Sequence, residues 1–128
     1  MQKVPVIAIV DDDEAVRIAT RSLVRSLGFT AHTFASAEDF LQSGHVGECS
    51  CVITDVQMPG LSGVDLQSRL LADGRDTPII FMTAFADESV QSRAMKAGAV
   101  CFLSKPFDGR VLIKYLEEAL DRSRTAQP

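Results

Sequence analysis

The sequence predicts an α/β protein with an open, doubly wound, five-stranded parallel sheet. Short apolar runs alternate with segments whose apolar residues recur every three or four positions, which are the patterns of buried strands and amphipathic helices. Five such alternations indicate a parallel sheet with helices on both faces. The 128 residues are too few for a closed (β/α)8 barrel, which takes about 250 residues. We therefore expect an open sheet.

The first strand is predicted at 6–10, where apolar residues follow one another without a break. Apolar residues at helical spacing then run from 15 to 27. Gly28 ends this helix, because glycine readily takes the left-handed conformation found just beyond helix ends. The second strand is predicted at 30–34 and is more polar than the first.

A short helix and the third strand come next. Ser36 is a good N-cap for the helix, with Asp39 three residues further on. The third strand is predicted at 51–54, and the Pro-Gly pair that follows it is typical of a loop. Beyond the loop, Leu66 and Leu70 lie one helical turn apart, which predicts the third helix.

The last two strand–helix pairs follow the same plan. Pro78 opens the fourth strand, 79–82, and Asp87 is a candidate cap for the helix after it. The fifth strand is predicted at 100–103, and Asp108 is a candidate cap for the final helix. The final helix carries an apolar stripe of Val111, Leu112, Tyr115, Leu116, Ala119 and Leu120.

The composition is that of one soluble globular domain, with 46% hydrophobic and 23% charged residues. We expect the domain to span 1–122 and the polar stretch 123–128 to be a tail or the start of a linker. No apolar run approaches the roughly 20 residues of a membrane helix, and a signal-peptide layout is missing. A cytoplasmic protein without membrane contacts is expected, and the net charge of −4 argues against direct nucleic-acid binding.

The cysteines and histidines give no metal-binding pattern. Cys49, Cys51 and Cys101 are odd in number, and Cys-x-Cys is not a usual zinc or redox spacing. Reduced thiols are expected, with Cys101 as a small core residue. His32 and His45 are isolated from each other in the sequence and lack metal-ligand spacing, so we expect ordinary surface or strand positions for both.

Polar side chains follow four of the five predicted strands. Asp11 and Asp12 come after the first strand and Asp55 after the third, while Thr83 and Lys105 come after the fourth and fifth. The carboxyl ends of parallel strands meet at one edge of the sheet, where open α/β sheets bind ligands. We therefore expect these side chains to form one site.

The charges of this site predict a bound cation. Two carboxylates about 5 Å apart repel each other by about 3 kcal/mol at an effective dielectric constant near 20, so Asp11, Asp12 and Asp55 need positive charge beside them. Oxygen ligands without histidine or cysteine favour Mg²⁺ over Zn²⁺. With Thr83 and Lys105, this set suits phosphoryl transfer. Asp55, alone on the central strand, is the candidate nucleophile.

Simpler explanations exist for each part of the set. Asp12 and Asp13 are also in place to cap the first helix. Thr83 alone would be an ordinary strand-end hydroxyl, and Lys105 alone a solvated lysine. A small phosphatase with an aspartate nucleophile would need an acid–base aspartate where the chain has Gln57. A flavodoxin-like flavin binder would need a hydroxyl- and glycine-rich loop after the first strand, where acids stand instead.

The set and its surroundings resemble the receiver domain of two-component response regulators. The stretches that carry the resemblance are 10–14 (VDDDE), 54–60 (TDVQMPG), 82–84 (MTA) and 105–107 (KPF). The resemblance covers about 4–122. Within it, the sequence is similar to that of the FixJ-type subgroup, whose members usually add a helix-turn-helix DNA-binding domain. It implies a flavodoxin-like (βα)5 fold with strand order 2-1-3-4-5.

The resemblance also implies a role for each residue of the site. Asp55 would accept a phosphoryl group from a phosphohistidine of a sensor histidine kinase. Mg²⁺, or Mn²⁺ in its place, would be held by Asp12, Asp55 and the backbone carbonyl of Gln57, with help from Asp11. Lys105, next to a cis peptide bond to Pro106, would pair with the phosphoryl group. The chain would then be no enzyme beyond catalysing its own phosphorylation and dephosphorylation.

The switch and the output are likewise implied by the resemblance. Thr83 would move to the phosphoryl group, and Phe102 would turn inward behind it. The helix after the fourth strand, the fifth strand and the last helix would form the output surface, with a homodimer through it and transcription as the output.

Gln57 and Phe85 would flank the phosphoryl group and tune its lifetime, although Phe85 as a partner-facing aromatic is an equal alternative. A pseudo-receiver that acts as an interaction module without phosphorylation is the alternative function.

Overall fold

The structure, a computed structural model, describes residues 4–85 and 87–125. The strands of this part are β1 Val6–Val10, β2 Thr30–Phe34, β3 Cys51–Asp55, β4 Ile79–Thr83 and β5 Cys101–Ser104. Its α-helices are α1 Glu14–Ser26, α2 Ala37–Gln42, α3 Gly63–Ala72, α4 Glu88–Lys96 and α5 Gly109–Thr125. The strands pair in parallel in the order β2-β1-β3-β4-β5, which confirms the predicted fold and strand order.

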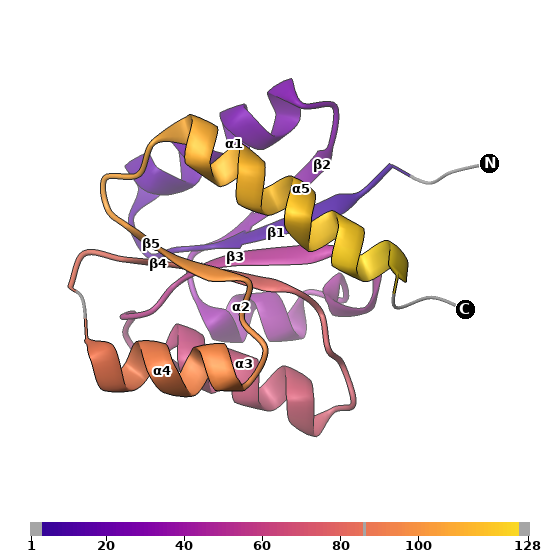
Figure 1. Ribbon diagram of the computed structural model, residues 1–128. Helices are drawn as coiled ribbons and strands as arrows, with labels where there is room; N and C mark the ends of the chain where they lie inside the picture. The colour runs from indigo at the N-terminus through magenta and orange to yellow at the C-terminus, as the bar shows by residue number, and fades with distance from the viewer. Residues whose placement is uncertain (1–3, 86, 126–128) are drawn as a thin grey trace.

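The sheet lies between two layers of helices (Figure 1). Helices α1 and α5 cover one face, and α2, α3 and α4 cover the other. Strand β1 shows how the sequence builds both layers: Ile7 and Ile9 join the core under α1 and α5, whereas Ala8 and Val10 join the core on the opposite face. Because both faces are buried, the strand is apolar throughout rather than alternating with polar residues.

The ends of the central strands are level with one another. Strands β3 and β4 are buried at every position, including Asp55 and Thr83 at their last residues. Asp55 is opposite Met82 in the register, and Thr83 is opposite Ser104. The loops that leave these strands therefore start from one edge of the sheet, as the strand–helix alternation predicted.

The helix ends follow the sequence signals. Ser36 accepts a hydrogen bond from the backbone N–H of Asp39, and Asp87 caps α4. Asp108 accepts a hydrogen bond of 2.8 Å from the backbone N–H of Arg110 at the start of α5, so all three predicted caps are confirmed. Asp13 caps α1, which shows that one acid of the first loop has the simple structural role considered above. Gly28 follows α1 with φ +87°, the left-handed conformation that favours glycine.

Some boundaries differ from the predictions. Strand β5 begins one residue later than predicted, because its pairing with β4 starts at Cys101. Helix α5 continues to Thr125, so part of the predicted tail is helical, and 126–128 lie outside the described residues. The short 3-10 helix η1, Val46–Glu48, was not predicted.

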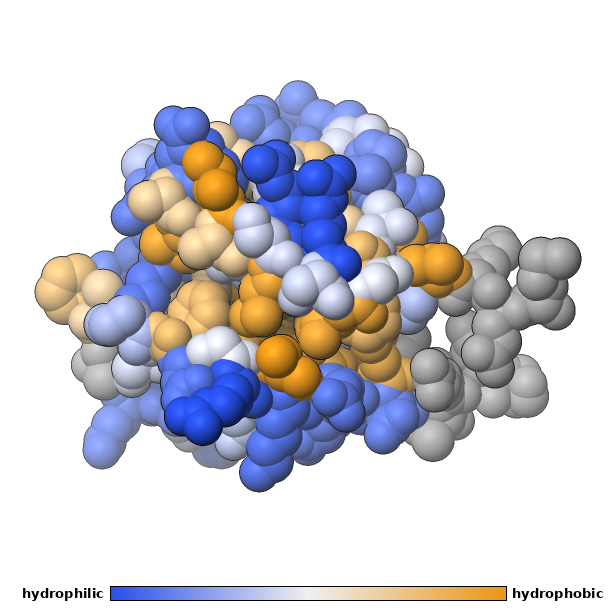
Figure 2. Space-filling model, turned by 90° about the horizontal axis from the view of Figure 1, so that it is seen from above, coloured by the Kyte–Doolittle hydropathy of each residue, from blue (hydrophilic) through white to orange (hydrophobic). Residues whose placement is uncertain are grey.

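The face above α1 and α5 carries hydrophobic side chains between hydrophilic ones (Figure 2). Ile18 of α1 and Val111 of α5 are among the large apolar residues that remain exposed. Within the described part of the chain, no helix combines the length and the hydropathy that crossing a bilayer requires.

Candidate functional site

Asp55 is placed at the end of the buried central strand β3 and points its carboxylate toward charged and polar groups. Its Oδ2 lies 3.0 Å from Nζ of Lys105, and its Oδ1 accepts a hydrogen bond of 3.3 Å from the backbone N–H of Gln57. Only 7% of the residue is exposed. A carboxylate this buried stays charged only with partners, and Lys105 provides the opposite charge.

Asp11 is the most deeply buried acid of the site and is completely shielded from solvent. Its Oδ2 lies 2.8 Å from Nζ of Lys105, and its Oδ1 accepts a hydrogen bond of 2.9 Å from the backbone N–H of Asp13. Burial raises the pKa of Asp11 above its usual value, although both of these contacts oppose the rise, and the nearby charge of Asp55 adds to it. In the folded protein Asp11 therefore loses its proton less readily than an ordinary aspartate does.

Lys105 joins the two carboxylates. Burial alone would lower the pKa of Lys105, but its hydrogen bonds to Asp11 and Asp55 outweigh this effect, and the net pKa is raised. The backbone N–H of Lys105 donates to the carbonyl of Thr83 at 2.8 Å, which holds the β5–α5 loop against the end of β4. The peptide bond to Pro106 is cis, which confirms that prediction.

Three carboxylates of the site are close enough to share one ion. Asp11, Asp12 and Asp55 each offer an oxygen, and these three oxygens lie within 4.8 Å of one another. Two of the acids are buried, whereas Asp12 is exposed and open to solvent. All-oxygen ligands with room for water molecules suit Mg²⁺ better than a softer ion, so the residues present fit the predicted metal.

Thr83 is tied to its own loop rather than to the carboxylates. Its hydroxyl donates to the carbonyl of Phe85 at 2.8 Å and accepts from the backbone N–H of Phe85 at 3.0 Å. The hydroxyl thus both donates and accepts within its own loop, and its single hydrogen must leave the Phe85 carbonyl before it can be donated to a group on Asp55. Phe85 as a whole residue is 69% exposed.

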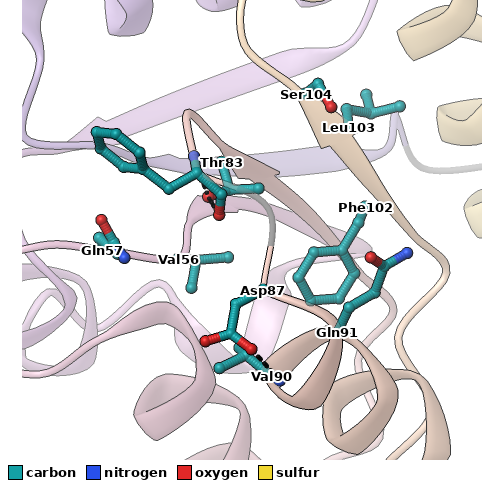
Figure 3. A pocket seen from close by; sticks show the side chains of 10 residues that line it. Val56, Gln57, Thr83, Asp87, Val90, Gln91, Phe102, Leu103 and Ser104 are labelled. Carbon is teal, nitrogen blue, oxygen red and sulfur yellow. Dashed lines mark hydrogen bonds between the residues drawn. The ribbon is translucent and has the colours of Figure 1, made fainter.

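A cavity of about 120 Å³ adjoins the site on the α4–β5 side (Figure 3). Its lining includes Gln57 and Phe85 from the loops, Thr83 from the end of β4 and Phe102 from β5. Phe102 is only half-buried, and its ring stacks on that of Phe81 at 4.8 Å between centroids. All four residues predicted for switching or tuning therefore line one cavity.

Comparison with known proteins decides the family. The family model described as the response regulator receiver domain matches residues 7–117. This chain belongs to that family. The response regulator protein TodT of Pseudomonas putida is 44% identical to the receiver domain over 115 residues. That match covers 90% of this chain and 51% of TodT, so the receiver domain spans about half the length of this relative.

Further relatives support the FixJ-type resemblance. FixJ of Bradyrhizobium diazoefficiens is 39% identical over 122 residues, which cover 95% of this receiver domain and 58% of FixJ. Among solved structures, the response regulator StyR superposes with a TM-score of 0.90 at 40% identity, covering 98% of this chain and 63% of StyR. The structure titled FixJ-N gives 0.81 at 36% identity, covering 94% and 96%.

The receiver domain also contains site contacts that sequence reasoning missed. A side-chain atom on Gly63 would lie 2.2 Å from the carbonyl oxygen of Asp55, so only glycine fits where α3 meets the end of β3. Ser62 and Asp65 form a capping box at this helix start. The Ser-x-x-Asp spacing was visible in the sequence, whereas nothing there revealed the close approach of Gly63.

The expectation that the two histidines are isolated from each other is wrong. The rings of His32 and His45 stack with centroids 4.1 Å apart, and both approach Glu48. His32 lies on β2 and His45 just before η1, so the 3-10 helix that was not predicted brings them together. Sequence spacing could not reveal this contact because it is made across the fold.

Proposed function

We propose that this receiver domain is a phosphorylation-activated signalling switch whose phosphoryl group is carried by Asp55. The observation that supports it most is the convergence at the sheet edge: Lys105 contacts Asp11 and Asp55 at 2.8 and 3.0 Å, within a set of three carboxylates close enough to share a cation. A purely structural site would have little use for three acids and one lysine in this place, since burying charges is unfavourable.

The proposed donor is a phosphohistidine of a sensor histidine kinase. A carboxylate oxygen of Asp55 attacks phosphorus, the phosphorus–nitrogen bond of the donor breaks, and the bonding electrons leave with the imidazole. Lys105 stays beside the carboxylate and offsets the charge of the transferred group. A divalent cation held by Asp11, Asp12, Asp55 and the Gln57 carbonyl, Mg²⁺ or Mn²⁺, supplies further positive charge when bound. The chain thereby catalyses only its own phosphorylation and dephosphorylation.

The switch follows from the contacts of Thr83. Phosphorylation adds close to two negative charges and new acceptor oxygens at Asp55. The Thr83 hydroxyl exchanges its bonds with Phe85 for a phosphoryl oxygen, and the β4–α4 loop moves with it. The cavity next to Thr83 gives the Phe102 ring space to turn inward. These movements change the surface of α4, β5 and α5, which is the proposed output and homodimer surface.

The proposed output is control of transcription through a DNA-binding partner domain. Relatives with printed names such as transcriptional regulatory protein FixJ are about twice as long as the stretch they share with this chain. The net charge of −4 argues that this domain does not itself hold nucleic acid.

Intact-mass spectrometry after incubation with acetyl phosphate tests the proposal. The wild-type protein gains the mass of one phosphoryl group with Mg²⁺ and not with EDTA, and Asp55→Asn gains none. Asp76→Asn removes an exposed carboxylate and is the matched control, which still gains the group. A wild-type protein that gains no such mass, or a gain that persists in Asp55→Asn, would contradict the proposal, and the absence of any gain would favour the pseudo-receiver alternative.

A further inference from the structure

A second cluster of potential metal ligands lies on the edge strand and shares no residue with the acidic site. It consists of His32 of β2, His45 at the start of η1 and Glu48 at the end of η1. We propose that these three side chains bind a transition-metal ion of the Zn²⁺ class, with water completing the coordination. Each residue offers one ligand atom, and the three atoms lie within 4.8 Å of one another.

The spacing of these atoms is close to what a metal ion needs. A tetrahedral Zn²⁺ with bonds of about 2.1 Å holds neighbouring ligand atoms about 3.4 Å apart. Nε2 of His32 lies 3.4 Å from Oε1 of Glu48, and Nδ1 of His45 lies 2.5 Å from the same oxygen. The second pair is at hydrogen-bond distance, and a metal ion would take the place of the proton between the two atoms. To reach the tetrahedral spacing, these atoms would move apart by less than about 1 Å.

The two imidazoles lie beside each other before any ion arrives. Their rings stack at 4.1 Å with an angle of 21° between planes, so both present nitrogen to the same carboxylate. Phe34, two residues after His32 on the same side of β2, lies 6.4 Å from the His45 ring and packs into the core. A metal ion lies near the plane of each imidazole that binds it, so the stacked rings must turn about their side-chain bonds to share one ion. Because the fold already brings both rings to the same carboxylate, binding requires side-chain rotation and not the approach of distant residues.

The neighbouring thiol does not belong to the set. Cys49 donates its S–H to the carbonyl of His45 at 3.2 Å. Cys49 is not one of the residues whose ligand atoms lie within 4.8 Å of one another. The ligands are therefore two imidazoles and one carboxylate, the set that leaves an open position in many zinc sites.

Ligand chemistry separates this cluster from the acidic site. Imidazole suits Zn²⁺, Co²⁺ and Ni²⁺, whereas the oxygen-only set of Asp11, Asp12 and Asp55 suits Mg²⁺. The side chains of His32, His45 and Glu48 are 32%, 39% and 49% exposed, so ions and water reach them. A bound ion would cross-link the segment between α2 and β3, which contains η1, to the edge strand β2.

The first test is titration of the Mg²⁺-saturated protein with Zn²⁺, followed by calorimetry and by NMR of the imidazole nitrogens. The chain has only two histidines, so each ring signal reports directly on one proposed ligand. We expect one Zn²⁺ per chain and shifts of both imidazoles, with Mg²⁺ in excess causing neither. Zn²⁺ binding that leaves both imidazole signals in place would overturn the proposal, because the ion would then sit elsewhere.

The second test uses variants. His32→Gln with His45→Gln, and separately Glu48→Gln, should each weaken Zn²⁺ binding about tenfold or more. Glu117→Gln, which removes an exposed carboxylate from α5, is the matched control and should bind as the wild type does. Circular dichroism confirms that each variant is folded. Equal Zn²⁺ affinity in the double histidine variant would overturn the proposal, and the wild-type NMR titration decides the question even if a variant fails to fold.

Discussion

The ammonium nitrogen of Lys105 lies 3.0 Å from Oδ2 of Asp55, although the two residues are 50 positions apart in the chain. The same nitrogen lies 2.8 Å from Oδ2 of Asp11. One lysine from the loop after β5 thus contacts both the acid that follows β1 and the acid at the end of β3. A change at one of these three residues should therefore alter the electrostatic environment of the other two.

Replacing Lys105 with glutamine should make the protein depend on Mg²⁺ for stability. Without the ammonium, Asp11 and Asp55 face each other with no positive charge, and we expect a loss of about 2 kcal/mol in unfolding free energy in metal-free buffer. Mg²⁺ should then stabilise Lys105→Gln more than the wild type, because it is the one remaining cation for these acids. Urea denaturation with and without Mg²⁺ measures both effects.

Lys114→Gln is the matched control, because it removes an exposed lysine from α5. It should leave both the stability and the response to Mg²⁺ close to those of the wild type. If Mg²⁺ stabilises Lys105→Gln no more than it stabilises the wild type, the ammonium and the metal do not compete for the same acids.

Replacing Asp11 with asparagine should stabilise the protein in a pH-dependent way. Burial raises the pKa of Asp11 above its usual 3.8. Below that value the carboxyl is protonated in the folded and unfolded states and carries no penalty. As the pH rises through the raised pKa, ionisation lowers the unfolding free energy of the wild type but not of Asp11→Asn. The melting temperature of the variant should therefore exceed that of the wild type by a few degrees at neutral pH in EDTA.

A pH series of thermal melts checks this sign. The gap between Asp11→Asn and the wild type should open as the pH rises above about 3.8 and become constant once Asp11 is fully ionised. Asp76→Asn, at an exposed position, should show no such opening. A gap that narrows as the pH rises would mean that the contacts with Lys105 outweigh burial.

Replacing Gly63 with alanine should disturb the end of β3. The new Cβ would lie 2.2 Å from the carbonyl oxygen of Asp55 and 3.2 Å from the Phe81 ring. Since backbone has to move to relieve the first contact, we expect a loss of about 3 kcal/mol in unfolding free energy. Gly109→Ala is the control, because its Cβ would meet only Leu23 at an ordinary 3.5 Å. Chemical denaturation of both variants tests the contrast, and equal stability of the two would refute the steric argument.

The fold was predictable because its signals are local. Alternation of apolar runs with helical spacing predicted the strands and helices, and Ser36 and Asp87 were recognisable as caps from residue type alone. The acidic site was predictable for a related reason. Once the strands are parallel, the ends of β1, β3, β4 and β5 must meet at one edge, whatever the details of packing.

Contacts made between distant elements were not predictable in this way. The clash that reserves Gly63 for glycine depends on the angle at which α3 meets β3. The stacking of His32 on His45 depends on η1, a short turn without a strong sequence signal. The bonds between Thr83 and Phe85 depend on the path of one loop. Each is fixed by tertiary geometry, which residue spacing does not encode.

Replacing Phe85 with alanine should shorten the lifetime of the proposed phosphoryl group. Phe85 follows Thr83 by two residues and lines the same cavity as Gln57, so we expect its bulky apolar ring to limit the approach of water to the phosphoryl group. We expect dephosphorylation to speed up about fivefold, which corresponds to about 1 kcal/mol in activation free energy. Loss of the phosphorylated mass over time after acetyl phosphate is removed gives the rate.

Leu71→Ala, which trims an exposed apolar side chain on α3, is the control. If Phe85→Ala and Leu71→Ala lose the phosphoryl group at the wild-type rate, Phe85 does not shield it, and a partner-facing role for the ring is favoured.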